Sequence, residues 1–297
     1  MPEYNTPAGV TKANQAPSCQ ARLALGFAND GGATRLLENR HFGPLRVQKA
    51  LYPEGPGICH AIVVHPPGGI VGGDQLTLNI QVGAQAHALL ATPGAAKWYK
   101  ARQANDASRQ HVSLIVAPGG RLEWLPQETL LFDAAEVELT HEVELGFDAR
   151  YIACEILCFG RTASGETFNT GKVSQRTSIR QDGKLIWWEQ GLLAGASSAM
   201  TSPLGLHGKT VCATLTAAGS PQALSASLLQ AMREEMAVIC AEDEKNMFGI
   251  SAVKSVLVAR YLGDSSETAR RVMLCAWRHL RAPLMGCEAV VPRIWNT

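Results

Sequence analysis

The sequence lacks several short motifs that mark common enzyme classes. The pattern GxxxxGK[ST] does not occur in its 297 residues, so the chain should neither bind nor hydrolyse GTP through a P-loop. GxSxG is also absent, which leaves Ser/His/Asp catalysis without a supporting motif. No CxxC pair occurs, and this argues against a zinc ribbon. The function must therefore be inferred from other features of the sequence.

The chain is also poor in charge. Charged residues make up 18% of the sequence, against roughly 25% in an average soluble domain. The formal net charge is +1, without the basic excess of a nucleic-acid-binding protein. We therefore expect no nucleic acid partner, and the low charge suggests that much surface is buried against another protein.

Residues 1–18 are rich in Pro, Ala, Asn and Gln and contain no apolar run. They lack the apolar core of a signal peptide, and no later run reaches transmembrane length. The eight cysteines are scattered, without the spacing of a disulfide scaffold. We predict a disordered tail over residues 1–18, a single domain over residues 19–297, no membrane association and a cytoplasmic location with reduced thiols.

Most of the chain predicts β-structure. Up to about residue 218 the sequence reads as many short strands, for example 22–25, 58–64, 76–82 and 112–116, separated by turns that contain Gly or Pro. Residues 136–145 alternate between apolar and mostly acidic side chains. This alternation predicts a one-sided antiparallel strand with a solvated acidic face.

The C-terminal third changes character. Apolar residues recur at helical spacing after Ser220 and Pro221, which are a good helix start. We expect residues 250–260 to return to a strand, and Ser266 then begins a second helix that ends at Pro283 and Gly286. The predicted fold is mostly β with a helical C-terminal part, an α+β arrangement.

A glycine-rich loop, residues 65–74 (HPPGGIVGGD), follows a buried apolar strand. It matches neither a P-loop nor GxGxxG. It is either a tight connection closed by Asp74 in an Asx turn, or a loop that exposes Asp74 to a channel or partner. His60 and His65 are an odd number of residues apart in an extended segment, so they should face opposite sides and not chelate one ion.

Glu155 lies in an apolar strand, YIACEILCF at residues 151–159. The alternation places it among apolar residues on its own face, where an unpaired carboxylate would cost several kcal/mol. It must meet an arginine, take up a proton, touch water or bind a cation. We consider two interpretations, a pair with Arg161 or Arg176 and a carboxylate that lines a wet passage.

Two further acids are embedded in apolar surroundings. Glu128 lies in LPQETLLFD at residues 125–133, and Glu189 follows Trp187 and Trp188. A glycosidase could be built from two such carboxylates, although nothing in the sequence fixes their separation.

Several motifs in order resemble one known family. They are Leu51–Gly55 (LYPEG), the loop at residues 65–74, Thr92–Tyr99 (TPGAAKWY), Leu125–Phe132 (LPQETLLF), Glu155–Arg161 (EILCFGR) and the ending Pro292–Trp295 (PRIW). Together they resemble the urease accessory protein UreD family, also called UreH, from about residue 20 to the C-terminus. The first 18 residues lie outside the resemblance.

The resemblance implies a non-catalytic chaperone that helps to insert nickel into apo-urease. It implies a twisted, helix-like stack of β-strands with a C-terminal helical part. The partners that it implies are the helical accessory protein UreF, the GTPase UreG and urease, with nickel supplied through the carrier UreE. No tightly bound cofactor is implied, only nickel(II) in transit.

The resemblance also implies an internal, water-filled nickel passage lined by acidic residues. We assign that role to Asp74, Glu128, Glu155 and Glu189, because each is an acid within or beside a family motif. Scattered carboxylates suit a conduit, since Ni²⁺ accepts imidazole and carboxylate ligands and must be released again. The alternatives are a β-rich hydrolase that uses paired carboxylates, and an adaptor that never touches metal.

Overall fold

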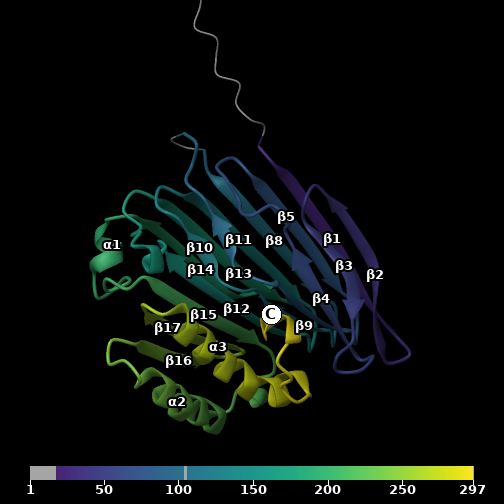
Figure 1. Ribbon diagram of the computed structural model, residues 1–297. Coiled ribbons are helices and arrows are strands. Elements are labelled where there is room, and N and C mark those ends of the chain that lie inside the picture. The colour runs from purple at the N-terminus through teal and green to yellow at the C-terminus, as the bar shows by residue number, and fades with distance from the viewer. Residues whose placement is uncertain (1–17, 104–105, 297) are drawn as a thin grey trace, which may run out of the picture.

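The computed structural model describes residues 18–103 and 106–296. Within them the strands form two sheets (Figure 1). The seven-stranded sheet has the order β14 (Lys184–Ala194), β13 (Lys172–Gln181), β11 (Glu136–Leu145), β8 (Ser108–Val116), β5 (Gln75–Val82), β1 (Gln20–Asp30) and β2 (Ala33–Phe42). The predicted tail falls, apart from Ser18, outside the described residues.

The other sheet is ten-stranded. Its main path has the order β16 (Met247–Val253), β17 (Val256–Gly263), β15 (Val211–Ala218), β12 (Arg150–Phe159), β9 (Arg121–Leu125), β6 (His87–Ala91), β4 (Ile58–Val64) and β3 (Arg46–Leu51). Two short strands, β7 (Ala96–Trp98) and β10 (Thr129–Leu131), pair beside this path.

The chain passes back and forth between the two sheets from β4 to β13. Successive strands within each sheet are parallel, as in the pairs β5–β8, β8–β11, β6–β9 and β9–β12. Each passage through both sheets is thus one coil of a helix-like stack. The predicted fold class, mostly β with a helical C-terminal part, is confirmed.

One strand prediction was wrong. Residues 136–145 form β11 as expected, but β11 is parallel to both of its neighbours, β8 and β13. The alternation correctly reported that one face is buried and the other solvated. It carried no information on strand direction, because a parallel sheet whose outer face meets water shows the same pattern.

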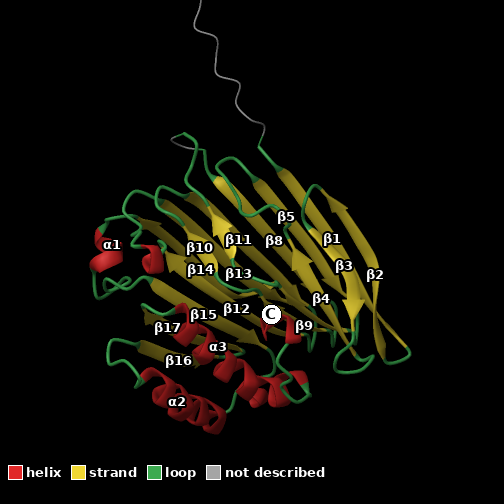
Figure 2. Cartoon of the chain, viewed as in Figure 1, coloured by secondary structure: helices red, strands yellow, loops and turns green. Residues whose placement is uncertain are grey.

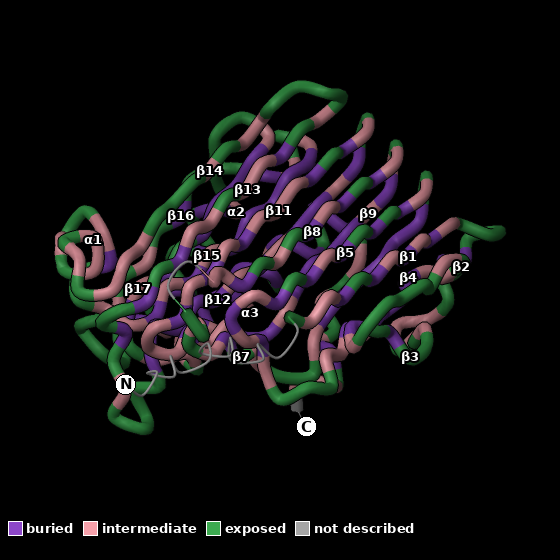
Figure 3. The backbone as a smooth tube through the Cα atoms, turned by 90° about the horizontal axis from the view of Figure 1, so that it is seen from above, coloured by how far each residue is buried: buried purple, intermediate pink, exposed green. Residues whose placement is uncertain are grey.

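The molecule has three layers (Figure 2). The inner faces of the sheets pack against each other in one apolar core, and α2 (Ala226–Cys240) and α3 (Ser266–Leu280) cover the other face of the ten-stranded sheet in a second core. The outer face of the seven-stranded sheet carries ion pairs such as Arg109–Glu138 at 2.7 Å. Figure 3 shows buried and exposed positions alternating along β5 and β8.

The helix ends refine the sequence prediction. Ser220 and Pro221 begin only a 3₁₀ turn, Pro221–Ala223. The helix α2 begins later, where the Ser225 hydroxyl accepts a hydrogen bond from the Leu228 amide at 3.2 Å. The helix α3 begins at Ser266 as predicted. None of the described helices has the length and apolar character to cross a bilayer.

The remaining helical segments are short. They are α1 (Ser198–Thr201), the 3₁₀ turns Thr162–Ser164 and Arg293–Asn296, and a π turn, Arg281–Met285, that directly continues α3. The π turn ends at Gly286, whose φ of 72° is a left-handed conformation that favours glycine. The chain then runs back over the helical layer, and Trp295 packs against Trp277 of α3.

Candidate functional site

A cavity of about 380 Å³ lies between the two sheets. Two loops rich in Gly and Pro line it, at residues 65–70 and 92–97, together with Pro126, Gln127 and Thr129. Its other walls come from inward-facing residues of both sheets. Polar side chains gather there from β11, β13 and β14 on one side and from β12 and β15 on the other. The cavity therefore brings a group of polar side chains into an otherwise apolar inter-sheet layer.

Glu155 lies on the wall of this cavity. The alternation predicted from sequence holds along β12: Ile152 and Ile156 face the helical layer, while Tyr151 and Leu157 face the other sheet. Glu155 shares the second face and is half-buried. It accepts a hydrogen bond from the side-chain amide of Gln175 on β13, so this contact bridges the two sheets.

The predicted arginine partners of Glu155 bind other acids. Arg161 pairs with Glu166 at 2.7 Å, and Arg176 pairs with Glu142 at 3.1 Å. The ion-pair interpretation of Glu155 was therefore wrong. The two arginines that the sequence suggested as partners of Glu155 therefore neutralise other acids.

The environment of Glu155 favours its neutral form. Burial raises the pKa of this carboxyl to about 7, and the negative charge of Glu189 contributes in the same direction. The hydrogen bond from Gln175 opposes the shift. Since burial penalises the charged form, either a proton or a bound cation would stabilise this carboxylate.

Glu189 also lines the cavity, from β14. Its carboxylate pairs at 2.5 Å with Arg260 of β17. Because β14 and β17 belong to different sheets, this ion pair bridges them near the edge strands. Glu155 and Glu189 are thus the two predicted acids that the fold brings to one site.

Two histidines add imidazole groups to the cavity wall. His141 of β11 is hydrogen-bonded through Nε2 to the Tyr151 hydroxyl at 2.6 Å, and burial lowers its pKa to about 4. Burial also lowers the pKa of His65. Both rings are neutral at neutral pH, the form that can bind a metal. Sequence reasoning missed His141, although a histidine on the apolar face of an alternating strand was a usable signal.

Asp74 does not line the cavity but holds the chain around it. It is 5% exposed, and its carboxylate accepts hydrogen bonds from the amides of Cys19 at 2.8 Å and Val71 at 3.0 Å. The second contact closes the turn at the end of the glycine-rich loop. This agrees with the interpretation of a tight connection, although the bonded amide precedes Asp74, unlike that of an Asx turn.

Glu128 turns away from the cavity toward the helical layer. Its carboxylate is buried and pairs with Arg270 of α3. His60 is likewise committed elsewhere, to Glu54 at 2.7 Å. His60 and His65 thus face different surroundings, as their odd spacing indicated.

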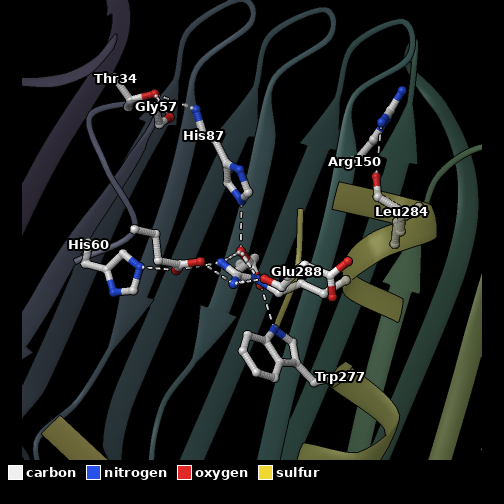
Figure 4. Close-up of polar contacts among 11 residues, drawn as sticks. Thr34, Gly57, His60, His87, Arg150, Trp277, Leu284 and Glu288 are labelled. Carbon is white, nitrogen blue, oxygen red and sulfur yellow. Dashed lines mark hydrogen bonds and ion pairs between the residues drawn. The ribbon is translucent and has the colours of Figure 1, made fainter. Parts of the chain in front are cut away.

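A second polar cluster, entirely missed from sequence, lies between the ten-stranded sheet and α3 (Figure 4). Arg281, fully buried, donates hydrogen bonds to Glu54 at 2.5 and 2.8 Å, to Glu123 at 3.1 Å and to the Glu288 carbonyl at 2.7 Å. His87 and the Trp277 indole bind Glu123 at 2.8 and 2.6 Å. We call Glu54, His60, His87, Glu123, Trp277 and Arg281 the Arg281 cluster.

The Arg281 cluster is electrostatically satisfied. Hydrogen bonds from His60 and Arg281 overcome burial and lower the pKa of Glu54 to about 2. The pKa of Glu123 is also lowered, against full burial, by His87 and Arg281. These acids hold their charge and offer no open position, so the cluster joins the sheet to the helices and is not a binding site.

The fold is a two-sheet β-structure with several polar side chains in its inter-sheet cavity, and buried ion pairs join it to a helical layer. Comparison with known families gives the class of protein. The family model described as UreD urease accessory protein matches residues 19–296, and the chain belongs to that family. The family description and the names of the curated relatives are those of an accessory protein and not of an enzyme, in agreement with the prediction that the chain is not an enzyme.

Curated relatives cover almost the whole chain. The urease accessory protein UreD of Janthinobacterium sp. (strain Marseille) is 59% identical over 278 residues, 94% of this chain and 92% of the relative. UreD of Nitrosospira multiformis is 53% identical over 278 residues, 94% of this chain and 98% of the relative. UreD of Dechloromonas aromatica is 46% identical over 289 residues, 97% of this chain and 98% of the relative. The resemblance read from the motifs is thereby confirmed.

Proposed function

We propose that this protein is a urease maturation scaffold that passes nickel(II) through the inter-sheet cavity toward apo-urease. The observation that carries the proposal is the half-buried carboxylate of Glu155 on the cavity wall, which is bonded to Gln175 and not paired with an arginine. Family membership supplies the context of urease maturation. In this proposal nickel is cargo and not a resident cofactor.

The donor set of the cavity suits a transient stay. Glu155 and Glu189 offer oxygen, and the neutral rings of His65 and His141 offer nitrogen. Ni²⁺ accepts both kinds of ligand. Each donor is already hydrogen-bonded, ion-paired or protonated. Nickel would have to displace that partner or proton, so its binding should be weak enough for release. Asp74 and Glu128 do not line the cavity, so in this proposal they would contribute to the passage only by supporting the segments beside it.

The proposal includes partners and a location. UreF and the GTPase UreG would assemble on this scaffold, UreE would supply nickel, and apo-urease would receive it in the cytoplasm. The missing P-loop supports a division of labour in which GTP hydrolysis belongs to a partner. The scarcity of charged residues, 18% of the chain, supports extensive contact with other proteins.

Co-expression of the chain with the urease structural and accessory subunits tests the proposal. Urease would be recovered by pull-down, and its nickel content measured for wild type and for Glu155→Gln. The glutamine keeps the shape and can accept the hydrogen bond from Gln175, but it cannot carry the charge. We expect normal assembly with urease that contains clearly less nickel.

Glu144→Gln is a matched control, because Glu144 lies on β11 at the solvated outer face and pairs with Arg180 there. It should leave both assembly and nickel content unchanged. Normal assembly with normal nickel content in Glu155→Gln would remove Glu155 from the passage. If no cavity variant alters nickel content while pull-down still succeeds, the protein acts as an adaptor that does not touch metal.

A further inference from the structure

A second group of metal-ligating side chains lies in the helical layer, on the other side of the ten-stranded sheet from the cavity. Glu235 of α2 and Cys275 and His279 of α3 place one ligand atom each within 4.8 Å of the others. The His279 Nε2 is 2.8 Å from a Glu235 carboxylate oxygen. The glycine-rich loop and the family motifs include none of these residues.

Helix geometry explains why these donors converge. Cys275 and His279 are four residues apart on α3 and therefore project from the same face, one turn apart. The helix α2 packs beside α3 in the second core, and Glu235 reaches across from it. The backbone is rigid on both sides, so three donors are already held together without a loop rearrangement.

The three donors are buried to different extents. Cys275 is 2% exposed, whereas the side chains of Glu235 and His279 are 53% and 25% exposed. An ion could approach from solvent over the carboxylate and imidazole and meet the sulfur at the bottom. The open side would keep positions for water or for a ligand from another protein.

We propose that Glu235, Cys275 and His279 form an exchangeable site for a borderline divalent ion such as Ni²⁺ or Zn²⁺. The set of one nitrogen, one sulfur and one carboxylate oxygen selects such ions over Mg²⁺ and Ca²⁺, which require oxygen ligands. Three protein ligands with an open position are typical of sites that exchange a ligand, unlike closed structural zinc sites. This inference does not depend on the proposed passage.

Binding must displace the thiol proton of Cys275. Burial, together with the nearby Glu235, raises the pKa of this thiol to about 12, while the positive charge of Arg278 opposes the shift. The thiol is thus protonated in the metal-free protein, and the metal forms its bond to sulfur as the proton leaves to solvent. The contact between His279 Nε2 and Glu235 is replaced by two metal bonds, and the proton on Nε2 moves to solvent or, through the other ring tautomer, to Nδ1.

Titration of the purified full-length chain with Co²⁺ is the direct test, because a cobalt–thiolate bond gives a charge-transfer absorption band. We expect one equivalent of Co²⁺ with this band in the wild type and no band in Cys275→Ser. Glu235→Gln and His279→Ala should weaken Co²⁺ binding by about 10-fold or more. Equilibrium dialysis with Ni²⁺ would check the same order of affinities.

Two variants serve as controls. Glu234→Gln changes the neighbouring exposed acid on α2, and Cys19→Ser changes a thiol far from α3 in sequence. Both should bind Co²⁺ as the wild type does. If Cys275→Ser fails to fold, the more exposed Glu235→Gln and His279→Ala variants still decide the question. A charge-transfer band that is absent from the wild type, a band that survives in folded Cys275→Ser, or unchanged affinity in both other variants would overturn the proposal.

Discussion

Two glutamates on adjacent strands of the same sheet have pKa values that are shifted in opposite directions. Glu123 of β9 faces the helical layer, and Glu155 of β12 faces the inter-sheet cavity. The pKa of Glu123 is lowered although the side chain is fully buried, whereas the pKa of Glu155 is raised to about 7. Burial alone raises the pKa in both places, so it does not decide the outcome.

The hydrogen-bond partners of each glutamate decide the direction of its pKa shift. Glu123 receives hydrogen bonds from the Arg281 guanidinium, the Trp277 indole and His87. Glu155 receives one from a neutral amide and faces the negative Glu189. A carboxylate saturated with donors is part of the architecture, and one that lacks them can still accept a proton or a cation. The hydrogen-bond partners thus distinguish an acid that keeps its charge from one that favours its neutral form, which burial alone does not do.

Removal of Arg281 should have the largest effect on this comparison. Arg281→Met keeps most of the side-chain volume but leaves Glu54 and Glu123 buried without their cation. We expect a loss of about 3–5 kcal/mol in the free energy of unfolding at neutral pH. Urea denaturation followed by circular dichroism would measure it.

The matched control is Arg271→Met, because Arg271 lies on α3, which directly precedes Arg281, and pairs with Glu242 at the surface. Its effect should be far smaller, as for exposed ion pairs in general. Combination of Arg281→Met with Glu54→Gln and Glu123→Gln should recover part of the loss. Equal unfolding midpoints for the two methionine variants would contradict the buried-cation argument.

Glu155→Gln should have an effect of opposite sign that depends on pH. The folded pKa of about 7 lies above the ordinary value of 4.5, so ionisation of Glu155 destabilises the folded protein progressively as pH rises between these values. At about pH 8 the glutamine variant should be more stable than wild type, by about 1–3 kcal/mol. The difference should vanish toward about pH 4.

Thermal or urea unfolding of both proteins across this pH range would measure the difference. Glu144→Gln on the solvated face provides the reference curve for loss of one surface carboxylate. A stability difference between Glu155→Gln and wild type that stays constant with pH would mean that Glu155 keeps an ordinary pKa.

Glu189→Gln sharpens the comparison with the smallest expected change. The charge of Glu189 contributes to the raised pKa of Glu155, so its removal should lower that pKa. The fall in stability with rising pH would then still begin near the ordinary pKa of a glutamate, but it would end at a lower pH and be smaller in total. The Arg260→Gln variant removes only the partner of the Glu189 ion pair and should not reproduce this downward shift, which would otherwise be a result of the broken pair.

Much of the fold could be predicted from local patterns. The alternation around Glu155 correctly assigned its face of the strand, and Ser266 correctly marked the start of α3. Strand direction could not be predicted, because it depends on connections between distant segments. The start of α2 was misplaced because Pro221 suits a 3₁₀ turn as well as a helix.

The candidate site was predicted in part. Embedded acids are visible in sequence, and two of the four reach the cavity. Their partners are not visible: Glu128 meets Arg270 across a separation of 142 residues, and Glu189 meets Arg260 across 71. Contacts at such separations follow from the completed fold, so a sequence alone identified Glu128 and Glu155 as similar when they are not.

The Arg281 cluster also has a consequence for the order of synthesis. Glu54 leaves the ribosome 227 residues before the arginine that neutralises it. A growing chain can therefore build the sheets but cannot close the helical layer until nearly its last residues emerge. We expect truncated chains that end before α3 to expose the apolar face of the ten-stranded sheet together with two uncompensated acids, which makes them substrates for general chaperones and proteases. Closure of the helical layer therefore waits until α3 and Arg281 have been synthesised.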